Sequence, residues 1–367
     1  VIEVFQKLSK KVVSMRAMNA MSAAGMALFL MFFLVMVNQD VQRIISDVNG
    51  KAFSVQSVKN SEKKRNPAPP FITSTLQQEA SRKLGFTTQK TMQIAQQLYE
   101  GVELAGEGSQ GLVTYIRTDS VRVADGARSQ AHEFIEANMG KEYIGSGKFT
   151  NKKNKDIQDA HEAIRPSDVT LDPEMLKESL TPEQYKLYKL IWSRFVACQM
   201  ADAIMDTVSS DIVSEGYIFR ASGYKVAFPG FTAVYEESTD DAKASDTTSG
   251  KPLPNFDEGD SLQCSKLTPA QHFTQPPARY TEASLIKAME EKGIGRPSTY
   301  APTISTILER DYVAKEGRSL KPTPLGEGVT ELLVDKFKSI SDLEFTAHME
   351  EELDEVENGK ISYVEVL

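Results

Sequence analysis

Apolar residues recur at helical spacing in two consecutive stretches, 74–84 and 88–100. Ser74 and Gln77 have the spacing of a capping box at the start of the first stretch, and Gly85 stands where a helix C-cap is expected. The pattern therefore predicts two adjacent helices, the second of which stops at Gly101.

Alternation of apolar and polar residues predicts strands elsewhere. One strand is expected from Ala52 to Val58, followed by a charged, proline-rich linker that ends at Pro70. Residues 206–267 alternate in short runs around a polar loop at 238–252, which is typical of a mainly β segment. A mixture of helical and strand-like stretches in one chain favours an α+β fold.

A second helical pair follows near the C-terminal end. Thr281 opens a predicted helix that ends at Gly293, Ser298 is positioned to cap another, and residues 312–323 form a predicted hairpin. Between the two pairs, Thr181 opens a further helix whose core-facing residues are expected to be Tyr188, Ile191, Trp192 and Phe195. Two helices followed by a β-prone segment is the order of a winged helix-turn-helix, a scaffold that binds nucleic acids.

One apolar stretch does not fit this organisation. Residues 17–37 are almost continuously apolar, with lysines before them, and have the length of a signal anchor or membrane span. No other membrane signal accompanies them in the sequence. A buried helix, or a segment whose sequence is misassigned, is the favoured interpretation.

Charge and cysteine content narrow the class of protein. The 367 residues carry a net charge of −9, which argues against a generally basic protein that coats nucleic acid. The stretch from Lys51 to Lys90 is nevertheless basic, and the acidic run at 350–357 is interpreted as a solvated helix face. Cys198 and Cys264 match no disulfide framework or metal-ligand spacing, which fits a reducing, cytosolic setting.

The segment GLVTYIRTDS, residues 111–120, contains the strongest candidate for chemistry. In an extended chain Tyr115 and Arg117 point to the same face, so a guanidinium could hold a phosphate beside the phenol oxygen. The hydroxyls of Thr114, Thr118 and Ser120 lie close by in sequence. The alternative is a half-buried tyrosine that packs and hydrogen-bonds through its hydroxyl.

Two further motifs carry candidate phosphate-binding residues. In QDAHEAIRPSD, His161 and Arg165 are spaced by one helical turn, and the alternative is that His161 only caps or packs. In GRPST, Arg296 and Thr299 coincide with the start of a predicted helix, where backbone N–H groups favour anions; the alternative is a plain loop and cap.

These motifs resemble the bacterial DNA topoisomerase I family of type IA enzymes over residues 40–367. The resemblance is carried by FITSTLQQEASRKLGF, QQLYEG, GLVTYIRTDS, AHEAIRPSD, LIWSRFVACQM, the long run from LTPAQHF to TISTI, and EFTAHMEEELDEV. It implies a toroid of winged-helix domains and a β-rich arch. The implied segments are a first arch part at 1–74, a winged helix with the catalytic tyrosine at 75–201, a second arch part at 202–279 and a C-terminal winged helix at 280–367.

The resemblance also implies a reaction. Tyr115 would attack a single-stranded DNA phosphodiester and become linked to the 5′ phosphate, and strand passage and rejoining would relax negative supercoils. Arg117 and His161 would support cleavage, and Thr118, Ser120, Arg165, Arg296 and Thr299 would contact DNA. The implied protein is a cytoplasmic, nucleoid-associated monomer that requires Mg²⁺ and acts on single-stranded and negatively supercoiled DNA, with no membrane partner.

The sequence departs from the family in two places. The glutamate and Asp-x-Asp cluster that hold magnesium in the family's N-terminal Toprim domain have no match, so no metal ligand is assigned. Residues 1–37 also lack the family's strand-rich character. We therefore expect the chain as given to bind single strands without relaxing supercoiled DNA, and the alternative is a non-catalytic module in which Tyr115 only stacks on bases.

Overall fold

The computed structural model describes residues 25–26, 36–37, 39–104, 108–149, 161–238, 256–270 and 272–366. The chain forms two compact units that interleave along the sequence. The first contains residues 1–61, 207–224 and 251–275, and the second contains 62–206, 225–250 and 276–367. Helices and strands are both present, so the α+β prediction is confirmed. The four domain segments proposed from the sequence remain a prediction.

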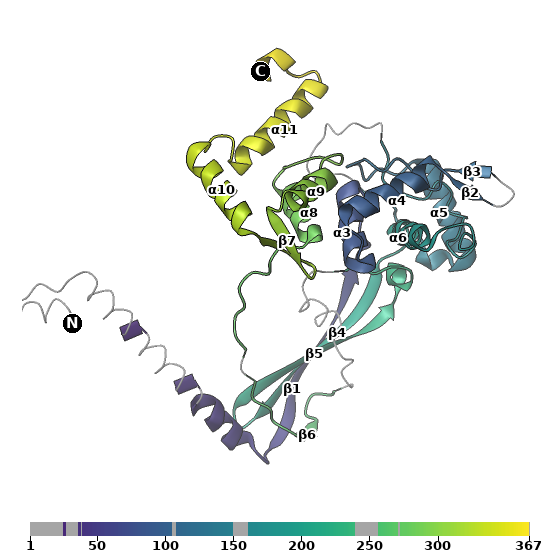
Figure 1. Ribbon diagram of the computed structural model, residues 1–367. Coiled ribbons are helices and arrows are strands. Elements are labelled where there is room, and N and C mark those ends of the chain that lie inside the picture. Colours follow the sequence, from purple (N-terminus) through teal and green to yellow (C-terminus); the bar gives the residue numbers. More distant parts are fainter. Residues whose placement is uncertain are drawn as a thin grey trace, which may run out of the picture. The chain divides into compact units, whose positions relative to one another are not determined.

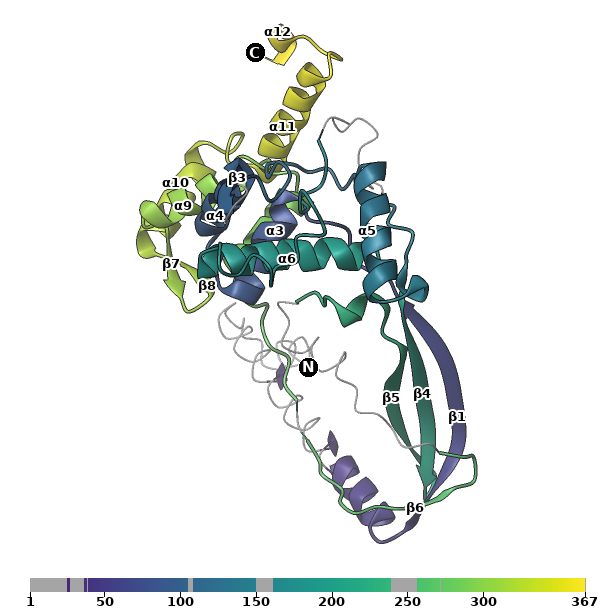
Figure 2. The same cartoon turned by 90° about the vertical axis from the view of Figure 1, so that its right-hand side faces the viewer.

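A four-stranded sheet in the order β5-β4-β1-β6 contains the long strands of the chain. These are β1 (Ala52–Arg65), β4 (Ala203–Ser214) and β5 (Tyr217–Phe228), which lie side by side in Figure 2, whereas β6 (Ser261–Gln263) is short and antiparallel to β1. Strand β1 runs through residues 59–65, where a linker was expected. The charged residues there remain in the strand because β4 pairs with β1. The hydroxyls of Ser61 and Thr207 also hydrogen-bond between these two strands at 2.7 Å.

The second unit contains most of the buried apolar residues. Its helices include α3 (Thr73–Glu79), the π-helical turn η1 (Ala80–Leu84), α4 (Thr88–Glu100) and α6 (Pro182–Cys198) (Figure 1). Gly85 ends the helical segment formed by α3 and η1, with a left-handed φ of 66°. Helix α4 has the predicted bounds. The predicted capping box is wrong, however, because the helix starts before Ser74, and both Ser74 and Gln77 are buried.

The elements between α4 and α6 follow the prediction in part. A short hairpin of β2 (Val102–Leu104) and β3 (Gly108–Gln110) follows α4. Helix α5 (Asp125–Asn138) and the turn η2 (Lys141–Tyr143) come next. Helix α6 begins after Thr181, as predicted, and Thr181 and Gln184 form a capping box there. Its predicted core residues are all buried: Tyr188, Ile191, Trp192 and Phe195.

The C-terminal helical pair and its hairpin pack beside α3 and α4. Helices α8 (Glu282–Glu291) and α9 (Tyr300–Glu309) are followed by β7 (Val313–Glu316) and β8 (Ser319–Pro322). Thr281 caps α8 as expected, and Gly317 makes the hairpin turn with φ 62°. Helix α9 begins after Thr299 rather than after Ser298, because the preceding residues form a turn whose backbone bonds join Thr299 to Arg296.

The last elements are α10 (Pro324–Lys336), α11 (Leu343–Glu357) and α12 (Tyr363–Val366); a short 3₁₀ turn, η3 (Gly230–Ala233), follows β5. Helix α11 buries none of its side chains fully. Within the described part of the chain, no helix is both long and apolar enough to cross a membrane. The apolar stretch at 17–37 lies almost entirely outside the described residues.

Candidate active site

Thr114 joins the two motifs that carry the candidate residues. Its amide donates to the carbonyl of Arg165 at 3.0 Å, and its hydroxyl donates to the carbonyl of Ala163 at 2.7 Å. The amide of Arg165 donates back to that hydroxyl at 3.0 Å, and a single β-bridge pairs Val113 with Pro166. Segments 111–120 and 161–168 therefore lie side by side, although about fifty positions separate them.

Residues 115–120 alternate between solvent and core. Ile116, Thr118 and Ser120 are buried, whereas Tyr115, Arg117 and Asp119 are exposed. This confirms that Tyr115 and Arg117 share a face, even though the segment forms isolated bridges instead of a strand ladder. Every second side chain of this segment is buried in the core, and the phenol and the guanidinium between them are accessible to a ligand.

Two aromatic neighbours flank the phenol ring. Tyr115 is 38% exposed, and its ring centroid lies 5.6 Å from that of Tyr99 and 5.2 Å from that of His161. Among the described residues, the phenol hydroxyl has no hydrogen-bond partner. Tyr115 is therefore partly exposed beside an imidazole, unlike a tyrosine that packs into the core.

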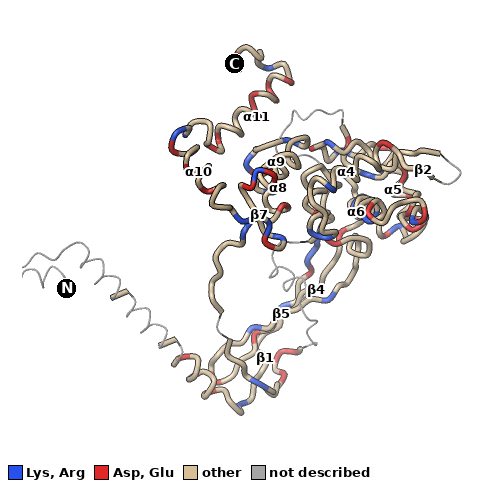
Figure 3. The backbone as a smooth tube through the Cα atoms, in the orientation of Figure 1, with Lys and Arg blue, Asp and Glu red and all other residues tan. Residues whose placement is uncertain are grey.

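Tyr115, Arg117 and His161 line one cavity of about 550 Å³. Arg117 has no side-chain partner in the part of the chain that the structure describes. The opposite wall comes from α11, whose acidic residues appear red in Figure 3. The other lining residues are Asp119, Arg296, Pro297, Ser298, Glu351, Asp354, Glu355, Glu357, Asn358 and Lys360.

Arg165 does not line this cavity. Residues 161–166 are not helical, because the segment bridges to Phe71 and to Val113 and ends at Pro166, so the predicted one-turn spacing with His161 is wrong. The guanidinium of Arg165 donates to Glu162 at 2.7 Å and to the carbonyl of Pro166 at 2.9 Å. Its side chain is only 13% exposed, so these bonds hold the motif in place.

Thr118 and Ser120 lie inside the segment and outside the cavity lining. The Thr118 hydroxyl accepts the amide of Ser120 at 3.0 Å, and the Ser120 hydroxyl accepts the amide of Arg122 at 3.2 Å. Thr73 bonds to the backbone of Thr118 from α3. Their predicted DNA contact remains a prediction, which this burial does not favour.

Arg296 lines the cavity but is engaged within the protein. Its Nε and Nη2 donate to the carboxylate of Asp354 at 3.3 and 2.6 Å, and its Nη1 donates to the carbonyls of Gly293 and Gly295. Burial acts to lower the pKa of Arg296, but Asp354 and Glu350 raise it, and the net direction is upward. Thr299 accepts the amide of Arg296 at 2.8 Å and so braces the same loop.

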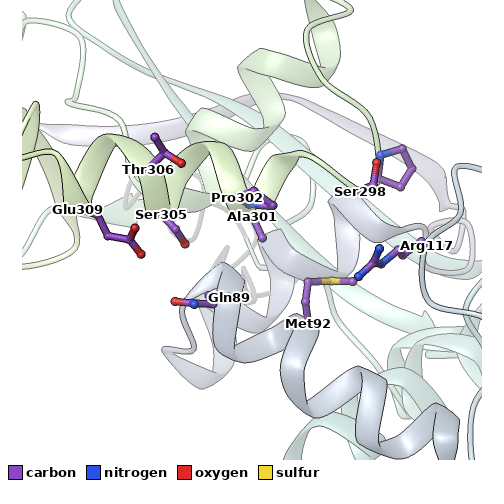
Figure 4. Close-up of a pocket in the computed structure, with 10 residues that line it drawn as sticks. Gln89, Met92, Arg117, Ser298, Ala301, Pro302, Ser305, Thr306 and Glu309 are labelled. Atoms are coloured by element: carbon purple, nitrogen blue, oxygen red, sulfur yellow. The ribbon is translucent and has the colours of Figure 1, made fainter.

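A second cavity of about 380 Å³ adjoins the first, between α4 and α9 (Figure 4). Gln89 and Met92 line it from α4, and Ser305 and Thr306 line it from α9. Arg117, Pro297 and Ser298 border both cavities. Sequence reasoning missed Ser298 as a lining residue because Ser298 was interpreted as a helix cap.

The described residues contain no group of three or more His, Cys, Asp or Glu side chains arranged to hold a metal ion. The carboxylate of Asp354 is already bonded to Arg296. These residues do not fit a magnesium site, so no step of the chemistry below is assigned to a metal.

Comparison with known proteins identifies the family. The family model described as DNA topoisomerase matches residues 34–367. The chain belongs to the bacterial type IA DNA topoisomerase family. It is similar to the solved structure of full-length topoisomerase I from Thermotoga maritima, with 39% sequence identity and a TM-score of 0.77. The match covers 89% of this chain and 52% of that one, so this topoisomerase chain spans about half the length of the protein it resembles.

Proposed function

We propose that this topoisomerase chain cleaves single-stranded DNA through Tyr115. The phenol oxygen attacks the phosphorus of a phosphodiester, the phenol loses its proton, and the bond from phosphorus to the 3′ oxygen breaks. The 3′ oxygen takes up a proton, and the 5′ phosphate remains on Tyr115. Rejoining reverses these steps, so no external energy source is needed.

Arg117 and His161 assist this transfer in our proposal. Arg117 pairs with the non-bridging oxygens, whose charge grows in the transition state, because its guanidinium shares the exposed face with the phenol. His161 is in ring contact with Tyr115 and takes the phenol proton. Arg165 positions His161 indirectly, because its hydrogen bond to Glu162 stabilises the 161–168 segment on which His161 lies.

One observation carries the proposal: an exposed phenol, Tyr115, and a guanidinium, Arg117, line the same cavity, and neither side chain has a hydrogen-bond partner among the described residues. A non-catalytic module that stacks bases on Tyr115 is the second candidate, favoured by the aromatic contact with Tyr99. Incubation with a labelled single-stranded oligonucleotide, followed by a denaturing gel, separates the two. A covalent adduct that disappears in Tyr115→Phe supports cleavage, and binding without an adduct supports the module.

We also propose functions for the elements around the site. Helices α8 and α9 with the β7–β8 hairpin form a winged helix that binds DNA, and α3, α4 and the following hairpin form another. The β5-β4-β1-β6 sheet belongs to the arch of a toroid through which a strand passes. The support is the order of elements, the family membership and the likeness to the Thermotoga maritima protein.

In the whole protein we propose strand passage, rejoining and relaxation of negatively supercoiled DNA by a monomer in the cytoplasm. Mg²⁺ dependence is part of this proposal and rests on the family resemblance alone. Salt-dependent binding of single strands is expected of this chain itself, because Arg117 and the basic stretch from Lys51 to Lys90 offer phosphate contacts.

A further inference from the structure

Most N–H groups of Arg296, the arginine of the GRPST motif, are bonded within the protein. A guanidinium has five N–H donors, and four of those of Arg296 bond to Asp354, Gly293 and Gly295. The carboxylate of Glu350 lies 3.8 Å from its Nε. A phosphate that formed a bidentate pair with Arg296 would have to displace the carboxylate of Asp354, which is a strong competitor for a guanidinium.

The same bonds shape the loop that borders the cavity. Gly293 and Gly295 have φ of 71° and 82°, so the backbone bends around the guanidinium and turns both carbonyls onto Nη1. After this bend, Pro297 and Ser298 line both cavities, as Arg117 does. Ser298 is exposed and has no hydrogen-bond partner within the described residues.

Helix α11 has few other attachments to the body of the unit. It buries no side chain fully, and Leu343, Phe345, Met349 and Leu353 remain 40–54% exposed. Two of its carboxylates, those of Glu350 and Asp354, pair with Arg296. Arg296 therefore helps to hold α11, whose residues line part of the tyrosine cavity.

We propose that Arg296 and Asp354 are a positioning pair that sets the width of the DNA path at Tyr115, and that Ser298 is the residue of this loop that contacts the strand. Resting on the proposed function, this inference gives Arg296 a different task from the phosphate contact implied by the sequence. The pair holds α11 and the loop at a fixed separation, so that a single strand is presented to Tyr115 between Arg117 and Ser298.

The test compares Arg117→Gln, Arg296→Gln, Asp354→Asn and the Arg296→Gln/Asp354→Asn double variant in the purified 367-residue chain. Oligonucleotide affinity is measured against salt concentration, and the adduct-forming rate is measured at saturating oligonucleotide. Glu344→Gln is the matched control, because Glu344 is an exposed carboxylate on α11 outside the cavity lining. Thermal unfolding identifies any variant that fails to fold.

Loss of one phosphate contact lowers the salt slope by about 0.7 for single strands. We expect this change in Arg117→Gln and not in Arg296→Gln. The adduct-forming rate should fall about tenfold to a hundredfold in both Arg296→Gln and Asp354→Asn, with no further loss in the double variant. Ser298→Ala should weaken oligonucleotide binding by about fivefold, the scale of one hydrogen bond.

Two results would overturn the positioning pair. One is a salt slope in Arg296→Gln that falls as far as in Arg117→Gln, and the other is tighter binding in Asp354→Asn, which would show that the carboxylate only withholds Arg296 from DNA. If the wild-type chain binds no oligonucleotide, the proposed function fails, and trypsin then tests the pair alone. Faster cleavage at Lys336 and Lys338 in both single variants supports the pair, and unchanged cleavage in Asp354→Asn refutes it.

Discussion

At the scale of single residues, exposure and hydrogen bonding distinguish the candidate phosphate-binding arginines better than residue type does. Of the arginines in the three motifs, Arg165 and Arg296 are tied to neighbouring carboxylates and carbonyls. Arg117 shares the exposed face with Tyr115 and has no side-chain partner within the described residues. We therefore expect Arg117, rather than Arg165 or Arg296, to contact the phosphate in the transition state.

Arg117→Ala should lower the rate of adduct formation by about 2–4 kcal/mol in activation free energy, because one charge-stabilising donor is lost. Arg117→Lys should recover only part of the rate, since an ammonium group lacks the planar fork. Single-turnover cleavage of a labelled oligonucleotide measures both. Arg220→Ala, which removes an exposed arginine paired with Asp211, is the control, and an equal loss there would refute the assignment.

Thr114→Val should destabilise the site by loosening the connection between segments 111–120 and 161–168. The substitution removes the hydroxyl that joins Ala163 and Arg165, at a cost of about 1–3 kcal/mol in the free energy of unfolding. Adduct formation should fall as well, because His161 lies on the segment that is released. Denaturant unfolding and the cleavage rate are compared with Thr303→Val, an exposed threonine on α9. Full cleavage in Thr114→Val would show that the tie is dispensable.

At the scale of elements, local signals predicted helices better than they predicted pairing. The bounds of α4 and the start of α6 follow from Gly101, Thr181 and Gln184, which act within one turn. The bridges of Val113 to Pro166 and of Phe71 to Ile164 could not be predicted, because they depend on contacts between distant segments. The same reason explains why 161–166 was taken for a helical turn.

Glu282 of α8 joins its own helix to α4 and to β7. It accepts the amide of Thr88 at 2.8 Å at the N-terminus of α4, and it pairs with Lys315 of β7 at 2.5 Å. Glu282→Ala should reduce the free energy of unfolding by about 2–3 kcal/mol, since a buried charged hydrogen bond is lost. Chemical denaturation measures the loss, and Glu291→Ala on the exposed end of α8 is the control. Equal effects of the two changes would contradict this account.

At the scale of the whole molecule, motif order could be predicted from the sequence, but the cavity could not. The tyrosine, the histidine and GRPST were each identified as chemistry-bearing, and their resemblance to type IA topoisomerases is confirmed by the family match. The participation of α11 was missed, because an acidic helix is usually solvated, and the contacts of Glu350 and Asp354 with Arg296 arise only in the folded chain.

The two cysteines provide a test of the fold as a whole. Cys198 is fully buried in α6, and burial raises the pKa of its thiol to about 12, whereas Cys264 is exposed. A thiol reagent at pH 8 should therefore titrate one cysteine in the native chain and two in denaturant. Mass spectrometry should place the native label on Cys264. Rapid labelling of Cys198 without denaturant would contradict the packing of α6.

The formation of a DNA adduct at Tyr115 tests the central claim most directly. An oligonucleotide labelled at its 3′ end should remain attached to the protein after denaturation, whereas a 5′ label should be released. Peptide sequencing by mass spectrometry should place the nucleotide on Tyr115, and Tyr99→Phe should retain the adduct while Tyr115→Phe abolishes it. An adduct on Tyr99, a retained 5′ label, or an adduct that survives in Tyr115→Phe would contradict the account.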